Sequence, residues 1–136
     1  MNCGLFQEEQ EKEATREAMS NTDIVTRIKV TEKQFLRDIV GLAKLRGWLV
    51  YHTWNSVHSA GGFPDLVLVR PHFLTAGGFY IEPRIIFAEV KSDAGKVKPE
   101  QELWLEALKG VARDWGFFRV FLWRPKDWLQ IVEALE

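Results

Sequence analysis

Residues 85–93, IIFAEVKSD, contain an apolar run that predicts a buried strand and that nevertheless carries a Glu and a Lys. Side chains alternate between the two faces of a strand, so Glu89 and Lys91 lie on the same face as Phe87. The rise of ~3.3 Å per residue puts the two charged residues about 7 Å apart along the strand. The strand therefore presents two opposite charges side by side on an otherwise apolar face.

Two explanations of this charged pair are open from the strand alone. An unpaired buried carboxylate is costly, and even a buried ion pair brings little net stability compared with apolar side chains. Stability of the fold is therefore a poor reason for burying the pair. The simple alternative is an exposed ion pair at the end of a strand. The functional alternative is a charged site that is completed by a third group from elsewhere in the chain.

A candidate for the third group is Asp65, in the segment GGFPDLVLVR at residues 61–70. Asp65 stands at the entry of another apolar strand, 24 residues before Glu89, which is a spacing that suits two neighbouring strands. If these strands pair, the two carboxylates converge and repel each other unless a cation lies between them. Oxygen ligands of this kind suit Mg²⁺. Taken alone, an Asp that follows Pro beside a glycine-rich loop, as Asp65 does, is usually a turn or cap residue.

The rest of the chain supplies helices and further strands around these two. An apolar stripe predicts a helix that Thr31 caps and Gly47 ends, and a second helix starts with Pro99 at its first position and ends at Gly110. Strands are expected at residues 48–54, 64–70, 85–91 and 117–123, a hairpin-like excursion at 71–84 and a last helix at 127–135. The order α-β-β-β-α-β-α predicts an α/β fold with a mixed sheet flanked by helices.

Composition agrees with one globular domain. The chain has 136 residues, of which 46% are hydrophobic, and contains no apolar run of membrane-spanning length. Residues 1–26 are charged and poor in large apolar groups, so we expect a flexible acidic arm followed by a folded domain at 27–136. No signal peptide is recognisable, and Cys3 has no second cysteine to pair with. A soluble, cytoplasmic protein without a membrane partner is the expectation.

Charge is distributed unevenly between the arm and the domain. The formal net charge of −1 argues against a general polyanion binder. Residues 1–23 carry −4, however, which leaves +3 on residues 24–136. A bound divalent cation would make the domain more positive still. A nucleic-acid partner is therefore permitted by the charge, although the charge does not require one.

The segments GGFPDLVLVR and FAEVKSDAGKVKPEQELWLEAL, residues 61–70 and 87–108, resemble the motifs of the VRR-NUC (virus-type replication-repair nuclease) domain, within the PD-(D/E)XK nuclease superfamily. The similarity runs from about Thr31 to the last residue. The resemblance implies a restriction-endonuclease-like core and a metal-dependent DNA endonuclease. It also implies a role in DNA repair or recombination, in a bacterium or a phage-infected host cell.

The resemblance also assigns roles to individual residues. Asp65 and Glu89 match the family's metal-binding carboxylates, and the carbonyl of Val90 matches a further ligand. Lys91 matches the catalytic lysine. The implied cofactor is Mg²⁺, with Mn²⁺ expected to substitute for it.

Two residues on helices match more peripheral members of the family's site. Gln101 matches a glutamine that borders the catalytic group, and it shares an apolar stripe with Trp104, which predicts that it faces inward. Glu32 matches an acid that family members often add to the metal site. The alternative for Glu32 is an ordinary first-turn glutamate favoured by the helix dipole.

Other polar residues allow either a functional or an ordinary interpretation. His58 could move protons, but a solvated loop histidine is the simpler explanation. Arg124 and Lys126, after the last strand, could contact phosphates or belong to a solvated turn.

The substrate expected from the resemblance is branched DNA, such as a four-way junction, cut by a homodimer. A two-fold dimer presents two active sites to two strands. The alternatives are a flap, nicking or restriction-type nuclease of a phage or mobile element. A catalytically silent nucleic-acid-binding module is a further alternative, disfavoured because Asp65, Glu89 and Lys91 are all present.

Overall fold

The structure, a computed structural model, describes residues 29–53, 57 and 60–136. It has the elements α2 (Glu32–Leu45), β1 (Leu49–His52), β2 (Leu66–Arg70), β3 (Phe73–Leu74), β4 (Tyr80–Ile81), β5 (Arg84–Val90), α3 (Pro99–Ala112), β6 (Phe118–Trp123), the 3-10 turn η1 (Pro125–Asp127) and α4 (Trp128–Ala134). The expected α/β fold is confirmed. The boundary expected at residue 26 and His58 lie outside the described residues and stay predictions.

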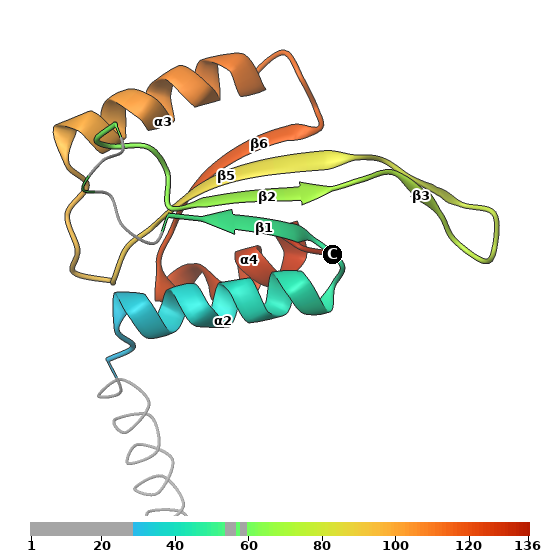
Figure 1. The fold of residues 1–136 in the computed structure, drawn as a ribbon, viewed down its shortest axis with the longest axis horizontal. Helices are drawn as coiled ribbons and strands as arrows, with labels where there is room; N and C mark the ends of the chain where they lie inside the picture. Colours follow the sequence, from blue (N-terminus) through green and yellow to red (C-terminus); the bar gives the residue numbers. More distant parts are fainter. Residues whose placement is uncertain (1–28, 54–56, 58–59) are drawn as a thin grey trace, which may run out of the picture. The chain divides into compact units, whose positions relative to one another are not determined.

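Four strands form one mixed sheet in the order β1-β2-β5-β6. β2 pairs antiparallel with both β1 and β5, whereas β5 and β6 run parallel. Parallel neighbours need a long crossover, and α3 provides it between β5 and β6. Figure 1 shows α3 over one face of the sheet, with α2 and α4 over the other. β5 therefore lies inside the sheet, with a strand on each side.

The main apolar core lies between the sheet and the pair α2 and α4. Helix α2 contributes residues at the i, i+4 and i+8 positions of one face, and β2 and β5 contribute alternate residues, as expected for a helix packed on a sheet. The fully or nearly fully buried members include Phe35, Ile39, Ala43, Leu66, Leu68, Ile86, Ala88, Val90, Trp123, Ile131 and Leu135. The opposite face of β5, which carries Phe87 and Glu89, is left for α3.

Helix α2 begins and ends at the residues that the sequence predicts. The Thr31 side chain accepts a hydrogen bond from the backbone N–H of Gln34, at 3.1 Å. At the other end Gly47 has φ +83°, and the N–H groups of Gly47 and Trp48 donate to the carbonyls of Lys44 and Ala43. This is the Schellman arrangement, in which glycine supplies the left-handed residue.

Helix α3 differs from the prediction at its end. Pro99 is its first residue as expected, but the helix continues past Gly110 to Ala112. Gly110 does not adopt a positive φ, so nothing at this residue stops the helix. A glycine inside a helix costs about 1 kcal/mol relative to alanine, and the helix still continues for two residues beyond it.

A short hairpin, β3 and β4, joins the end of β2 to the start of β5 and extends away from the sheet (Figure 1). Its turn uses Gly78 at φ +81°. Because β2 starts next to Asp65 and runs toward the hairpin, the hairpin lies at the opposite end of the sheet from Asp65. Within the described residues, no helix is long and apolar enough to cross a membrane.

Candidate active site

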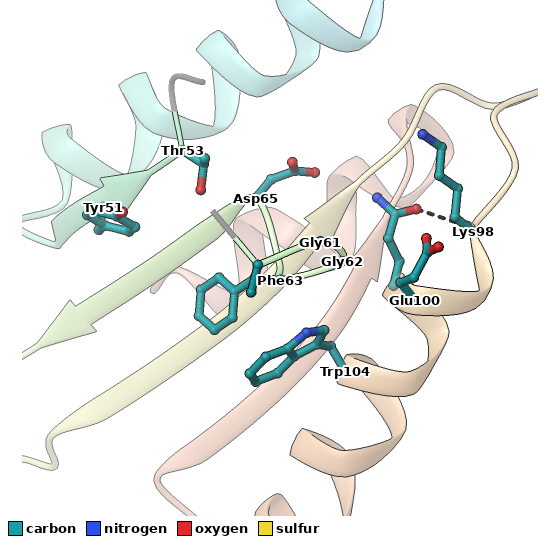
Figure 2. A pocket seen from close by; sticks show the side chains of 11 residues that line it. Tyr51, Thr53, Gly61, Gly62, Phe63, Asp65, Lys98, Glu100 and Trp104 are labelled. Carbon is teal, nitrogen blue, oxygen red and sulfur yellow. Dashed lines mark hydrogen bonds between the residues drawn. The ribbon is translucent and has the colours of Figure 1, made fainter. Parts of the chain in front are cut away.

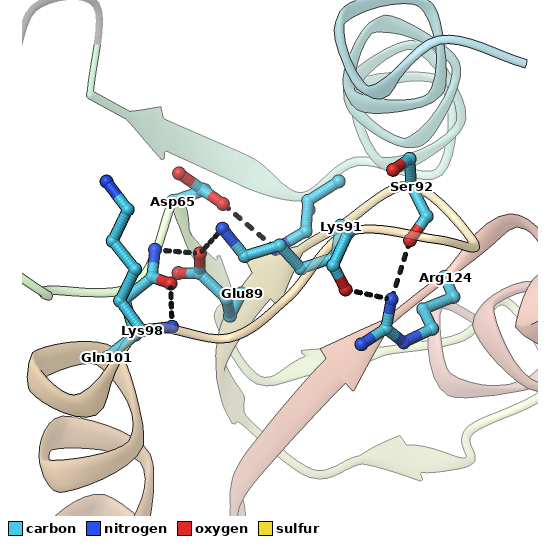
Figure 3. Close-up of polar contacts among 9 residues, drawn as sticks. Asp65, Glu89, Lys91, Ser92, Lys98, Gln101 and Arg124 are labelled. Atoms are coloured by element: carbon cyan, nitrogen blue, oxygen red, sulfur yellow. Dashed lines mark hydrogen bonds and ion pairs between the residues drawn. The ribbon is translucent and has the colours of Figure 1, made fainter.

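The pairing of β2 with β5 brings the two candidate acids together. Leu66 is opposite Ala88 in the antiparallel register, so Asp65 and Glu89 are the next residues at the end of this pair. Asp65 also bonds directly to β5, because its Oδ2 accepts a hydrogen bond of 2.9 Å from the backbone N–H of Val90. The predicted convergence of the two acids therefore follows from strand register, and a side-chain contact holds Asp65 in place (Figure 3).

The two carboxylate oxygens of Glu89 have different surroundings. Oε1 accepts a hydrogen bond of 2.6 Å from Gln101 Nε2 and lies 3.3 Å from Lys91 Nζ. Oε2 is buried and has no hydrogen-bond partner within the described residues. The Glu89 side chain is only 1% exposed, so solvent does not satisfy this oxygen. A buried acceptor without a partner costs about 1–3 kcal/mol, which makes Oε2 the atom whose environment calls for a ligand.

Burial raises the pKa of Glu89 from its ordinary value of 4.5 to about 7. The neighbouring Asp65 carboxylate adds to this increase by like-charge repulsion, and the Lys91 ammonium opposes it. The strand therefore holds a carboxyl group that releases its proton near neutral pH, or more readily when a cation lies beside it.

Gln101, in the first turn of α3, connects the helix to this carboxylate. Its Oε1 accepts a hydrogen bond of 2.9 Å from the backbone N–H of Lys98, and its Nε2 donates to Glu89. The first bond fixes which end of the amide faces Glu89. The inward orientation predicted from the stripe shared with Trp104 is therefore what the structure has, and Gln101 both caps its helix and orients an acid (Figure 3).

Lys91 follows the last residue of β5 and is 8% exposed. Its backbone N–H donates to the carbonyl of Trp123, which extends the pairing with β6 by one residue. Its ammonium group is the cation nearest to Glu89 and partly compensates the buried carboxylate. The side-by-side arrangement on one strand face is therefore the one that the alternation predicts.

Glu32 does not lie together with these acids. Its side chain is in the first turn of α2, where it is exposed. No group of three Asp, Glu, His or Cys side chains suited to a metal occurs within residues 29–53, 57 and 60–136. The ligand roles of Glu32 and of the Val90 carbonyl remain predictions.

The donor set fits a hard divalent cation. Asp65 and Glu89 offer oxygen ligands only, and Mg²⁺ is typically held by one or two carboxylates, with water and substrate oxygens completing its coordination. The unpartnered Glu89 Oε2 gives one ligand that nothing else in the described chain uses. The Lys91 ammonium lies beside them, where charge on a substrate phosphate would be offset.

Arg124 has a role that sequence analysis missed. Its Nη1 donates to the carbonyls of Ser92 at 2.6 Å and Gly95 at 2.7 Å, in the loop that follows Lys91. The same loop is held by Asp93, whose Oδ1 accepts from the backbone N–H of Lys126. Arg124 thus binds backbone rather than serving as a free phosphate contact. A sequence pattern cannot reveal this, because the carbonyls lie about 30 residues away on an irregular loop.

A pocket of about 550 Å³ opens beside Asp65 (Figure 2). Asp65 and Gln101 line one side, and the side chains of Phe63 and Trp104, in edge-to-face contact at 5.1 Å, line another. The rest of the described lining comes from β1 and the residue after it, from the loop before Phe63, and from the start of α3. Asp65 therefore borders a space open to a substrate, whereas the buried Glu89 is not among the residues that line it.

A mixed sheet that carries two acids and a lysine at the end of its central strand pair defines a restriction-endonuclease-like core. The family model described as the VRR-NUC domain matches residues 6–121 of the chain. The chain therefore belongs to the VRR-NUC family and is a nuclease of the PD-(D/E)XK type, a class that acts on DNA and generally uses divalent metals. Searches among curated proteins and solved structures give no match.

Proposed function

We propose that the chain is a Mg²⁺-dependent DNA endonuclease that cuts branched DNA as a homodimer. The observation that carries the catalytic part is the asymmetry of Glu89, whose Oε1 is bound by Gln101 and Lys91 while its buried Oε2 has no partner in the described chain. Burial of Glu89 next to Asp65 does not stabilise the fold. The two carboxylates together are a suitable pair of ligands for a divalent cation.

Each residue would have a distinct task. Asp65 and Glu89 would hold the divalent cation, which when bound polarises a phosphoryl oxygen and makes water more acidic. Lys91 would orient the attacking water and offset the negative charge that develops on the phosphate. Gln101 would keep the Glu89 carboxylate in one orientation. In-line attack of water would leave a 3′-hydroxyl and a 5′-phosphate.

Branched DNA is proposed from the resemblance to small members of the family that act like Holliday junction resolvases. A symmetric dimer would present two equivalent sites to two strands, as paired cuts at a junction require. The excess of bases over acids in residues 24–136, +3 in all, favours contact with phosphates.

A panel of DNA structures tests this proposal. Linear duplex, nicked, flapped and four-way junction DNAs of one sequence would be incubated with the protein and Mg²⁺, Mn²⁺ or EDTA. We expect symmetric cleavage of the junction with either metal, no cleavage in EDTA, and 5′-phosphate ends. Glu89→Gln and Lys91→Met, of similar size to the original residues, should abolish cleavage.

The outcomes separate the alternatives. Cleavage in EDTA, or full activity in Glu89→Gln, would contradict the metal site. Preference for a flap or nick would replace the junction by another structured substrate, and preference for linear duplex would favour a restriction-type enzyme. Binding of all four DNAs without cleavage in either metal would indicate a silent nucleic-acid-binding module.

A further inference from the structure

Gly62 makes the closest approach between the loop before β2 and helix α3. Its φ of +89° lies in the left-handed region, which favours glycine. A Cβ atom placed on Gly62 would lie 2.5 Å from both the carbonyl carbon and the carbonyl oxygen of Glu100, and 2.8 Å from its Cβ. Two of these three obstacles are backbone atoms of a helix, which cannot move aside as a flexible side chain could.

This contact joins the two segments that carry the site. Gly62 is three residues before Asp65, and Glu100 is the residue before Gln101. Figure 2 shows Gly62 beside the first turn of α3, between Asp65 and Glu100. The next residue, Phe63, continues the contact with its ring edge-to-face on Trp104, at 5.1 Å between centroids. The loop and the helix thus share one continuous seam.

A side chain at Gly62 would open this seam. An ordinary van der Waals contact of about 3.5 Å requires the helix or the loop to move by on the order of 1 Å. The hydrogen bond from Gln101 Nε2 to Glu89 Oε1, now 2.6 Å, would then exceed hydrogen-bond distance. Glu89 would lose the donor that fixes which of its oxygens is left for a ligand.

We infer that Gly62 is a positioning residue for the metal-binding acids, and that it acts through the first turn of α3 and Gln101. The absence of a side chain at this residue sets how closely α3 approaches β5, and therefore how Glu89 is oriented next to Asp65. This role rests on the proposed metal-dependent function.

The test compares Gly62→Ala with two matched glycine variants. Gly61→Ala changes the same loop, but no atom of the described residues lies within 4 Å of a Cβ added there. Gly78→Ala, in the hairpin at the far end of the sheet, also has a positive φ, of +81°, but a Cβ added there meets no atom of the described part of the chain within 4 Å. Gly61 therefore controls for place in the sequence, and Gly78 for backbone strain.

Two readouts separate positioning from folding, namely Mn²⁺ affinity without DNA, measured by electron paramagnetic resonance, and the thermal midpoint. We expect Gly62→Ala to weaken Mn²⁺ binding by about 10-fold and to lower kcat on cleaved DNA by about 100-fold, the loss typical of a 1 Å misplacement. Gly61→Ala should match the wild type in Mn²⁺ affinity and in the thermal midpoint. Gly78→Ala should lower the midpoint but keep the Mn²⁺ affinity.

A double-variant cycle tests the route through Gln101. Gln101→Ala removes the donor without a clash, so it should weaken Mn²⁺ binding to a similar extent. Combining it with Gly62→Ala should weaken Mn²⁺ binding little further, because both changes remove the same hydrogen bond from Gln101 to Glu89. Gln101→Ala also decides the question if Gly62→Ala does not fold, because wild-type Mn²⁺ affinity in Gln101→Ala would overturn the inference.

The outcomes distinguish this inference from the proposed function. If the wild type binds no Mn²⁺, the metal-dependent function and the positioning role are both overturned. If the wild type binds Mn²⁺ and Gly62→Ala binds it as tightly as Gly61→Ala does, the positioning role alone is overturned.

Discussion

The carboxyl group of Glu89 costs the folded state stability, although the proposed metal site requires it. Its carboxyl group is buried beside Asp65, which raises its pKa to about 7. Below pH 4.5 the group is protonated in both the folded and the unfolded chain. Between pH 4.5 and 7 the unfolded chain loses its proton first, so the folded state loses stability as the pH rises. Above pH 7 the full penalty applies, on the order of 3 kcal/mol.

This linkage gives a pH prediction for the metal-free protein. In EDTA, the thermal midpoint of the wild type should fall between pH 4.5 and 7 relative to that of Glu89→Gln, which cannot titrate at this residue. The difference between the two midpoints across a pH series is the measurement, because groups away from Glu89 titrate equally in both proteins. A constant difference across this range would contradict the raised pKa.

Asp65 has a structural task that the resemblance does not imply. Its Oδ2 accepts the hydrogen bond from the Val90 N–H, so Asp65→Ala leaves this donor without its partner, at a cost of about 1–3 kcal/mol. Asp65→Asn keeps an acceptor oxygen and removes the repulsion with Glu89. We predict that Asp65→Asn is more stable than Asp65→Ala by at least about 1 kcal/mol in urea unfolding.

Both Asp65 variants should lose Mn²⁺ binding, because neither offers a carboxylate. Equal unfolding free energies for the two variants would show that the hydrogen bond to Val90 contributes nothing. Wild-type Mn²⁺ affinity in either variant would remove Asp65 from the metal site.

The residues of the site were largely predictable because they lie on regular elements. Alternation along a strand places Glu89 and Lys91 on one face, and the helical stripe shared with Trp104 turns Gln101 inward. The asymmetry between the two Glu89 oxygens was not predictable, since it depends on distances of a few tenths of an ångström. The role of Gly62 was not predictable either. The sequence shows it only as a glycine of a motif, because its close contact with Glu100 joins distant parts of the chain.

At the scale of elements, the loop between β5 and α3 is the least regular part of the described site, and Arg124 holds it. The hydrogen bonds from Nη1 to Ser92 and Gly95 tie this loop to the end of β6. Charged donors strengthen such bonds, which each contribute about 1.5–3 kcal/mol when the acceptor is otherwise unsatisfied. The loop that follows Lys91 therefore depends on a residue from another strand.

We predict that Arg124→Met raises amide hydrogen exchange in residues 92–98 by at least about 10-fold, since local opening no longer breaks these bonds. Lys126→Met is the matched control, because Lys126 contacts Asp93 only through its backbone N–H. Exchange in the loop should be unchanged in this control. Equal protection in the wild type and Arg124→Met would show that the loop is held by other contacts.

Helices and strands were predicted with small errors, and the errors have local causes. The continuation of α3 past Gly110 arises because this glycine keeps a helical backbone. Gly47, which does adopt a positive φ, ends α2 where expected. A glycine is thus a reliable stop only where the chain after it turns back, as Trp48 does to bond Ala43.

At the scale of the described domain, the sheet separates the site from the hairpin. Asp65 and Glu89 lie where β2 begins and β5 ends, and the β3–β4 hairpin joins the other ends of these strands. Changes in the hairpin should therefore act on stability and not on the metal site. The order of the strands around β5 was predictable only in part, because the parallel place of β6 depends on the crossover through α3.

Anomalous diffraction from a crystal soaked in Mn²⁺ is the most direct measurement of the metal site. We predict one peak within coordination distance of both Glu89 Oε2 and an Asp65 carboxylate oxygen, with no peak there in a Glu89→Gln crystal soaked in the same way. A well-occupied peak elsewhere, with these two carboxylates unligated at saturating Mn²⁺, would contradict the site and the chemistry proposed for it.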